Sequence, residues 1–269
     1  MHLGLVGYGN IGAALLGHLR DGAVPARVTV LVRPGRGAAV AADLVPAWQD
    51  RAEVVEDPQA LIAARPELVV ESAGHAAVRD AAVPALAAGI DVVVVSVGAL
   101  ADPALAAALR AAAGAGGARM ILPAGAIGGI DLLAALATAG PVEVDYVGTK
   151  PPAAWRGTAA GMVLDLDRID APATFFTGTA REAALAYPKN ANVAATLALA
   201  GPGFDATRVR LVADPAAPGN LHAFEVRSET ARFSMRIENR PSAGNARTSA
   251  ATIHSLLREI RNRIGPVAI

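Results

Sequence analysis

Short hydrophobic runs alternate with alanine-rich stretches through the first half of the chain. The runs are apolar at successive positions, a pattern typical of strands in a parallel sheet that is covered on both faces. Strands are predicted over residues 3–6, 28–32, 53–55, 68–71, 92–97 and 119–122. Helices are predicted between them over residues 11–20, 38–43, 58–63, 76–88 and 103–113. This succession predicts an α/β fold with a doubly wound parallel sheet and right-handed crossovers.

The hydrophobic pattern changes after about Pro123. Helices are predicted over residues 128–139 and 190–200, with an irregular stretch from Lys150-Pro151-Pro152 onward between them. Residues 142–149 alternate more between apolar and polar, and strands are predicted over residues 207–213, 221–227 and 232–237. In the last two runs apolar and polar residues alternate, which is typical of antiparallel strands with one exposed face. This half therefore predicts a smaller α+β domain on a largely antiparallel sheet.

A closing helix is predicted over residues 248–263. Its apolar residues Ile253, Leu256, Leu257 and Ile260 recur at spacings of three and four, which places them on one helix face. We expect this face to pack back onto the first domain. The predicted domains are residues 1–123 together with 241–269, and residues 124–240.

Composition limits the kinds of protein that these elements can build. Of the 269 residues, 53% are hydrophobic and 18% are charged, which is enough apolar material for a core and excludes global disorder. Lys plus Arg equals Asp plus Glu at 24 each, so there is no basic excess to hold a nucleic acid. Cysteine is absent and the histidines lack ligand spacing, so neither a disulfide nor a metal site is expected.

The first residues run directly into a predicted strand. They lack the basic region, apolar stretch and cleavage site of a signal peptide. The apolar run over residues 92–97 is too short to cross a bilayer. We therefore expect a cytoplasmic protein with no membrane partner.

The sequence G-Y-G-N-I-G at residues 7–12 follows the first strand and opens the first helix. In that setting it is the fingerprint of a Rossmann dinucleotide-binding turn. Gly7 permits the tight turn, Gly9 lets the backbone approach a pyrophosphate, and Gly12 allows close packing of helix and strand. The helix N-terminus offers N–H groups to the phosphates. The predicted contacts with NAD or NADP are Gly7, Gly9, Asn10, Ile11 and Gly12.

The end of the second strand bears on the form of the cofactor. An NAD-specific site usually has an acid there, but the sequence at residues 32–36 is V-R-P-G-R. Arg33 and Arg36 either face a 2′-phosphate or are two solvated loop arginines. We expect NADP to be accepted, alone or beside NAD.

Two further loops follow parallel strands, S-A-G-H at residues 72–75 and S-V-G-A at residues 96–99. Loops at the carboxyl ends of such strands border the ligand crevice. Their small residues either leave room for ribose and nicotinamide or simply form turns. The predicted cofactor contacts in these loops are Ala73, Ser96 and Gly98.

With these motifs in place, the chain resembles the L-aspartate dehydrogenase family over nearly its whole length. The resemblance rests on residues 7–12, 96–99, 125–129, 188–196 and 218–222. The blocks around Asn192 and His222 are the most family-specific. The family is also similar in order, with a dinucleotide-binding domain, a smaller α+β domain and a helix that returns to the first.

This resemblance implies oxidative deamination of L-aspartate to iminoaspartate. Iminoaspartate either hydrolyses to oxaloacetate and ammonia or feeds NAD biosynthesis. The catalytic histidine of the family maps to His222, and its nicotinamide contacts map to Ala126 and Asn192. The resemblance also implies a homodimer through the second sheet, which is expected to present His222 toward the nicotinamide. Ala124 stands where a serine is expected and Arg33 where an NAD enzyme carries an acid, and both departures concern cofactor preference.

The residues themselves are compatible with these roles. A histidine pKa of about 6.5 suits proton transfer during imine hydrolysis. Periodicity leaves open which way His222 points, and His75 is the alternative because its loop borders the crevice. Asn192 can bond a carboxamide or cap a helix, and Asn190 competes for the capping role. The candidates for binding the substrate carboxylates are Lys189 first, then Arg247 and Thr248.

Two other functions remain open at this stage. One is a related reductase acting on dihydrodipicolinate or another imine. The other is a nicotinamide-sensing protein that binds the dinucleotide without turnover. Formation of NAD(P)H from a given amino acid separates the three functions.

Overall fold

The structure is a computed structural model that describes residues 1–20, 25–49, 51–188, 190–242 and 245–269, with the side chains of residues 241–248 outside the description. The chain divides into two compact units. The first is Met1–Pro123 with Ile253–Ile269, and the second is Ala124–Thr252. The second unit thus extends beyond the predicted limit at residue 240, because strands β12 (Pro241–Ser242) and β13 (Asn245–Ser249) pair with each other before the chain returns.

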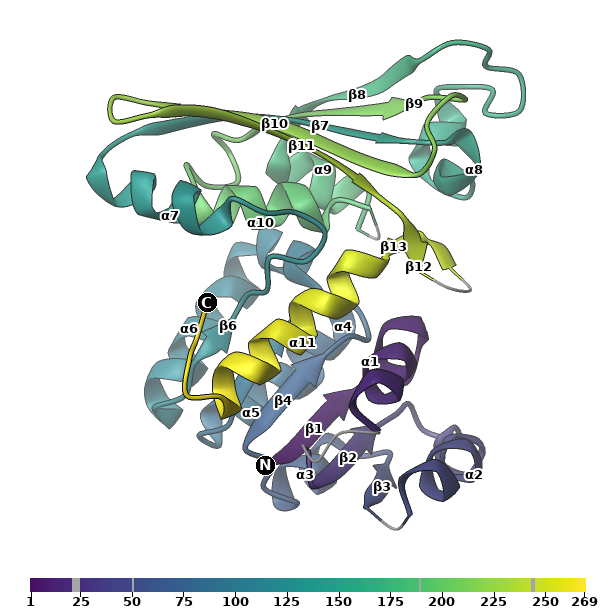
Figure 1. Ribbon diagram of the computed structural model, residues 1–269, viewed down its shortest axis with the longest axis vertical. Coiled ribbons are helices and arrows are strands. Elements are labelled where there is room, and N and C mark those ends of the chain that lie inside the picture. Colours follow the sequence, from purple (N-terminus) through teal and green to yellow (C-terminus); the bar gives the residue numbers. More distant parts are fainter. Residues whose placement is uncertain (21–24, 50, 189, 243–244) are drawn as a thin grey trace. The chain divides into compact units, whose positions relative to one another are not determined.

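The first unit contains the predicted doubly wound sheet (Figure 1). Its strands are β1 (His2–Val6), β2 (Arg27–Leu31), β3 (Ala52–Val55), β4 (Leu68–Glu71), β5 (Asp91–Val94) and β6 (Met120–Ile121). They are all parallel, in the order β3-β2-β1-β4-β5-β6. This is the Rossmann order, in which ligands bind where the winding reverses, here between β1 and β4. The predicted fold class is confirmed.

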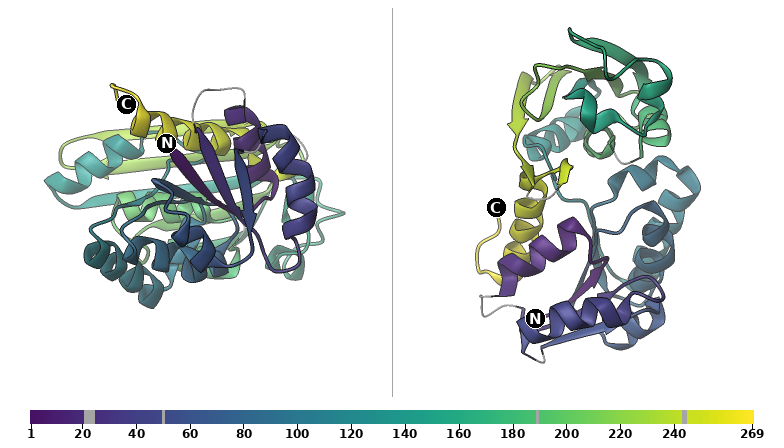
Figure 2. Two further views of the ribbon diagram at one scale, coloured as in Figure 1. Left: turned by 90° about the horizontal axis from the view of Figure 1, so that it is seen from below. Right: turned by 90° about the vertical axis from the view of Figure 1, so that its right-hand side faces the viewer.

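Helices cover both faces of this sheet (Figure 2, left). They are α1 (Asn10–Arg20), α2 (Gly37–Trp48), α3 (Pro58–Ala63), α4 (His75–Ala77), α5 (Val83–Ala87), α6 (Pro103–Gly116) and the part of α11 (Ala250–Ile264) from residue 253 onward. On one face, Leu16 of α1, Trp48 of α2 and Leu256 of α11 share a buried cluster with the strands. Close helix packing on both faces explains why the strands are apolar throughout.

The second unit contains a mixed five-stranded sheet. Its strands are β7 (Val142–Lys150), β8 (Ala173–Thr179), β9 (Arg208–Ala213), β10 (Asn220–Ser228) and β11 (Arg232–Asn239), in the order β11-β10-β7-β9-β8. Every neighbouring pair is antiparallel except β7 with β9, so the prediction of a largely antiparallel sheet is confirmed. The helices α7 (Ile130–Ala139), α9 (Ala180–Ala186) and α10 (Asn192–Ala200) lie along one face, and α8 (Pro152–Trp155) follows β7 (Figure 1).

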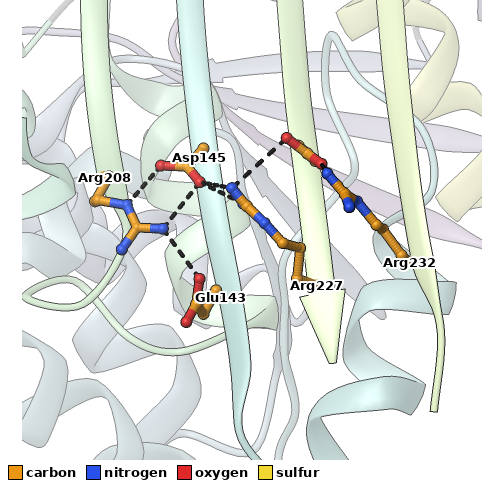
Figure 3. Close-up of polar contacts among 6 residues, drawn as sticks. Glu143, Asp145, Arg208, Arg227 and Arg232 are labelled. Carbon is orange, nitrogen blue, oxygen red and sulfur yellow. Dashed lines mark hydrogen bonds and ion pairs between the residues drawn. The ribbon is translucent and has the colours of Figure 1, made fainter. Parts of the chain in front are cut away.

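The opposite face of this sheet carries a row of ion pairs (Figure 3). Asp145 of β7 accepts hydrogen bonds from Arg208 of β9 at 2.5 Å and from Arg227 of β10 at 2.7 Å. The row continues through Glu225 to Arg232 of β11. Side chains alternate between the two faces of a strand, so this row lies on the side away from the helices.

Several elements differ from those predicted from the sequence. The stretch predicted to be irregular contains β8 and α9, and α9 begins with a capping box in which Thr179 and Glu182 bond each other's backbone N–H groups. The strand predicted over residues 92–97 ends at Val94, because Val97–Ala101 forms a 3₁₀-helix. Among the described helices, none is both long and apolar enough to cross a membrane.

Candidate functional site

The three glycines of residues 7–12 are needed for three different reasons. Gly7 has a φ of +95°, and a Cβ there would lie 2.8 Å from the Cβ of Ala73. A Cβ on Gly12 would lie 2.2 Å from the backbone oxygen of Gly7, so a side chain would push α1 away from the turn. A Cβ on Gly9 would meet nothing within 4 Å. Gly7 and Gly12 are therefore required by the fold, while Gly9 leaves open space above the turn.

A cavity of about 860 Å³ opens beside this turn, within the range of small-molecule sites. The predicted cofactor residues on its wall are Gly7, Gly9, Arg33 and Ala73. Asn10 and Ile11, also predicted, are the first two residues of α1, where backbone N–H groups lack partners within the helix. The open space at Gly9 and the adjoining cavity together fit the pyrophosphate and adenosine half of a dinucleotide.

The loop after β2 binds the carboxylate of Glu56, a residue that the sequence analysis missed. Arg33 and Arg36 are exposed there. Glu56, which follows β3, accepts a hydrogen bond from the Gly37 N–H at 2.5 Å. The amides of Gly35 and Gly37 hold the pKa of Glu56 below its usual range. Glu56 lines the same cavity as Arg33 and Arg36. Glu56 follows the strand that pairs with β2, so the sequence at the end of β2 does not reveal it.

Glu71, the last residue of β4, forms hydrogen bonds with both loops that were predicted to reach the cofactor. Its buried carboxylate accepts hydrogen bonds from the N–H groups of Ala73 at 2.8 Å and Gly74 at 2.9 Å. It also accepts from the Ser96 N–H at 3.0 Å and the Ser96 hydroxyl at 2.9 Å. Burial raises the pKa of Glu71 and these bonds oppose the rise. The Ser96 side chain thus serves the loop architecture, and Gly98 is buried in the 3₁₀-helix.

His222 is buried in β10, only 3% exposed. This strand buries its even-numbered residues from 220 to 226, so His222 points to the helix-covered face. Periodicity had left this direction open. The hydroxyl of Tyr146 on β7 lies 2.7 Å from Nδ1 of His222. Gly148 stands directly opposite His222 in the β7–β10 register, and a Cβ there would lie 2.6 Å from that hydroxyl. The glycine therefore gives Tyr146 the room to reach the imidazole.

Lys150 brings a buried positive charge into the same cluster. It ends β7 and is 4% exposed. Its ammonium donates to Oδ1 of Asn190 at 3.0 Å and lies 5.1 Å from the centre of the Trp155 ring, a cation–π distance. Burial, and secondly the charge of Lys150, lower the pKa of His222 to about 3. The imidazole is therefore neutral at physiological pH.

Neither asparagine near α10 caps that helix. The N-cap position is Ala191, which makes no side-chain capping bond, and Asn192 is the first helical residue. Asn190 instead accepts from Lys150. Ala126, predicted to contact the nicotinamide, accepts a hydrogen bond from Nδ2 of Asn239 at 2.8 Å through its carbonyl. Asn192 and Ala126 both belong to the second unit.

Asn220 presents a buried acceptor on the same face of β10 as His222. It is 3% exposed, and its Oδ1 has no hydrogen-bond partner within the described ranges. Such an acceptor is costly unless a ligand or water satisfies it. Lys189 lies outside the described residues, as do the side chains of Arg247 and Thr248.

The remaining candidates add little to the site. His75, the alternative histidine, begins α4 in the first unit. Over the part of the chain that the structure describes, no group of three or more metal-ligating side chains is found. Besides Glu56 and Glu71, sequence reasoning missed Tyr146 and Lys150 of β7.

Comparison with known proteins identifies relatives of both halves. A family model described as the aspartate dehydrogenase C-terminal domain matches residues 131–263. A model described as the NAD-binding domain of homoserine dehydrogenase matches residues 7–123. The two models meet near the boundary of the compact units at residue 123, and the second model extends into residues 253–263, which belong to the first unit.

Relatives of similar length extend over the whole chain. The L-aspartate dehydrogenase of Ruegeria pomeroyi is 47% identical over 264 residues, which cover 98% of this chain and 92% of that protein. The L-aspartate dehydrogenase of Ralstonia nicotianae is 46% identical over 269 residues and 100% of both chains. The crystal structure of aspartate dehydrogenase from Thermotoga maritima matches with a TM-score of 0.78 and 26% identity, covering 100% of this chain and 99% of that one.

Proposed function

The chain belongs to the aspartate dehydrogenase family, and we propose that it catalyses the NAD(P)-dependent oxidative deamination of L-aspartate. The products are iminoaspartate and, after hydrolysis, oxaloacetate and ammonia, with iminoaspartate also available to NAD biosynthesis. The observation that supports this function most directly is the buried Tyr146–His222 pair beside Lys150. It supplies an acid–base group and a cation in a chain that also carries a dinucleotide-binding turn.

The first unit binds the dinucleotide. The dinucleotide would supply a hydride acceptor for Cα of the amino acid. Backbone N–H groups at the start of α1 would hold its pyrophosphate in the open space at Gly9, and Glu71 keeps the neighbouring loops in place. Ala126 and Asn192 are proposed contacts of the nicotinamide through the family resemblance.

His222 acts as the acid–base group. Its Nδ1 is engaged by Tyr146, which leaves Nε2 to exchange protons with substrate or water. The neutral imidazole can take a proton from the water that attacks the imine carbon and return it to the departing ammonia. The hydroxyl of Tyr146 restrains the orientation of the His222 ring before substrate binds.

Lys150 is proposed to bind one carboxylate of the substrate. A buried ammonium is a strong partner for a carboxylate, since hydrogen bonds between charged groups are roughly twice as strong as neutral ones. Neutralising the charge of Lys150 would also relieve one of the two effects that lower the pKa of His222. Substrate binding thus raises the basicity of the histidine that must act on it. The Oδ1 of Asn220 offers an acceptor for the substrate amine, and Lys189 and Thr248 remain candidates for the second carboxylate.

Turnover with a panel of amino acids tests this function. Substrate-dependent formation of NADH or NADPH with L-aspartate supports it. Activity confined to another amino acid or imine would identify a related reductase. Binding of the dinucleotide without turnover on any member of the panel would identify a sensor.

We further propose a cytoplasmic homodimer that associates through the face of the second sheet opposite His222. Between the ion pairs of Figure 3 and the end of the sheet, half-buried Ala223 and Val147 stand side by side in the β7–β10 register. A small apolar area rimmed by paired charges suits a self-complementary contact. Light scattering should give the mass of two chains, and Ala223→Glu should shift it toward one. A wild-type mass of one chain would refute the dimer.

A further inference from the structure

The loop after β2 has the backbone geometry of an anion-binding nest. Gly35 has a φ of +80°, in the left-handed region, and Arg36 has φ −106° and ψ −10°, in the right-handed region. Alternation between these two conformations turns successive N–H groups toward one point, which suits an anion. In a Rossmann domain this loop lies beside the adenosine ribose, so a 2′-phosphate would meet these N–H groups.

Glu56 of the chain itself already fills this nest. Val55 pairs with Leu31 in the β2–β3 register, so the residue after β3 reaches the loop after β2. The Gly37 N–H donates to Oε1 of Glu56 at 2.5 Å. A Cβ on residue 37 would lie 2.6 Å from that same oxygen. A glycine at position 37 is therefore what admits the carboxylate.

The filled nest faces the cavity beside the glycine turn. Glu56 lines this cavity together with Arg33 and Arg36. Both arginines and Glu56 are exposed, so water and salt screen the charges of all three side chains. Glu56 is held by backbone amides, which lower its pKa and keep it ionised at neutral pH. The ordered charge nearest the nest is therefore negative.

We propose that Glu56 makes this cavity select NAD over NADP. The carboxylate occupies the amides that would otherwise bind a 2′-phosphate, repels that phosphate, and can accept a hydrogen bond from a 2′-hydroxyl. It takes the part that an acid at the end of β2 has in NAD-specific Rossmann domains, but it comes from the next strand. This inference rests on the proposed function, since both require a dinucleotide in this cavity. It reverses the expectation, drawn from Arg33 and Arg36, that NADP is accepted.

Calorimetric Kd values of NAD and NADP for the full chain test the proposal, with Glu56→Gln as the variant. Glu53→Gln is the matched control, because Glu53 lies on β3, is exposed, pairs with Arg27 at 2.6 Å and is not part of the cavity wall. The wild type should bind NAD more tightly than NADP. Glu56→Gln should shift the ratio of the two Kd values toward NADP by about tenfold, mainly through tighter NADP binding. Glu53→Gln should leave the ratio unchanged.

The outcomes separate this inference from the function on which it rests. A wild type that binds NADP as tightly as NAD overturns the selection by Glu56 without touching the dehydrogenase activity, and this measurement needs no variant. An unchanged ratio in a Glu56→Gln protein that melts like the wild type overturns it as well. If folded wild-type protein binds neither dinucleotide, the cofactor site itself is refuted, and the proposed function falls with it.

Discussion

The dinucleotide turn and the His222 cluster are built from different parts of the polypeptide. The turn at residues 7–12 is one continuous segment whose function depends on backbone N–H groups and on the absence of side chains. The cluster joins the side chains of Tyr146, Lys150 and His222 from two strands. The first region is therefore sensitive to added atoms, and the second is sensitive to removed ones. Variants that add atoms to the turn and variants that remove side chains from the cluster test the two sides of that difference.

The largest effect is expected from removing the imidazole. His222→Ala should lower kcat by about 10²–10⁴, the usual contribution of a positioned acid–base group. The Kd of NADH should hardly change, because the glycine turn lies in the other unit. Steady-state kinetics and calorimetry measure the two quantities. Turnover near the wild-type value would remove His222 from the mechanism.

Adding atoms to the turn should have two distinct outcomes. Gly9→Val should raise the Kd of NADH by about a hundredfold with little change in Tm, because its side chain enters open space that the pyrophosphate needs. Gly12→Ala should instead lower the stability by about 1–3 kcal/mol, because its Cβ meets the backbone oxygen of Gly7. Gly17→Ala, on an open surface of α1, is the control and should change neither binding nor folding adversely. Equal effects of Gly9→Val and Gly12→Ala on Tm would contradict the distinction.

Removing the buried cation should act on both substrate binding and pH dependence. Lys150→Met should lower kcat/KM for L-aspartate by about tenfold, the size of a lost charge-assisted hydrogen bond. The positive charge of Lys150 lowers the pKa of His222, so its loss raises that pKa. The acid limb of the kcat/KM profile should therefore move to higher pH. Arg210→Met, which removes an exposed cation from β9, is the control. An acid limb that stays in place would argue against coupling of the two groups.

The smallest effect is expected from the hydroxyl that restrains the imidazole. Tyr146→Phe should lower kcat by about fivefold, the value of roughly one hydrogen bond, with an altered pH profile and an unchanged KM. Gly148→Ala should act in the same direction, because its Cβ would displace that hydroxyl. If Gly148→Ala lowers kcat while Tyr146→Phe does not, the effect comes from the strand and not from the hydrogen bond.

The same difference between a continuous turn and a cluster of distant side chains explains which features could be predicted from the sequence. The glycine turn and the parallel strands are encoded by neighbouring residues, so the pattern of apolar runs and the G-x-G-x-x-G spacing predicted them. Helix α9 is also local, and its capping box T-A-R-E was readable but overlooked. The hydrogen bonds between Glu71 and Ser96 join residues 25 positions apart in the sequence, and the Tyr146–His222 contact joins residues 76 positions apart. Contacts of that kind depend on strand register, which the sequence of one element does not contain.

The resemblance to a family supplied His222 where periodicity could not. A histidine in an alternating strand can face either side, and only the burial of residues 220–226 resolved the direction. Lys150 was not predicted as a buried residue, because a lysine before two prolines is typical of the start of a surface loop. Its burial depends on contacts with Trp155 and with Asn190, which lies 40 residues further along the chain.

The cofactor-binding unit is completed by residues that follow the whole of the second unit in the chain. Leu256 and Ile260 of α11 pack into the same core as Leu15 and Leu16 of α1, more than two hundred residues earlier in the chain. A nascent chain that has left the ribosome only as far as α10 therefore keeps part of that face of its first sheet uncovered, although α1 and α2 already pack on it. Such long-range closure favours slow folding and exposes apolar surface during synthesis, so cellular yield should depend on chaperones and on an intact final helix.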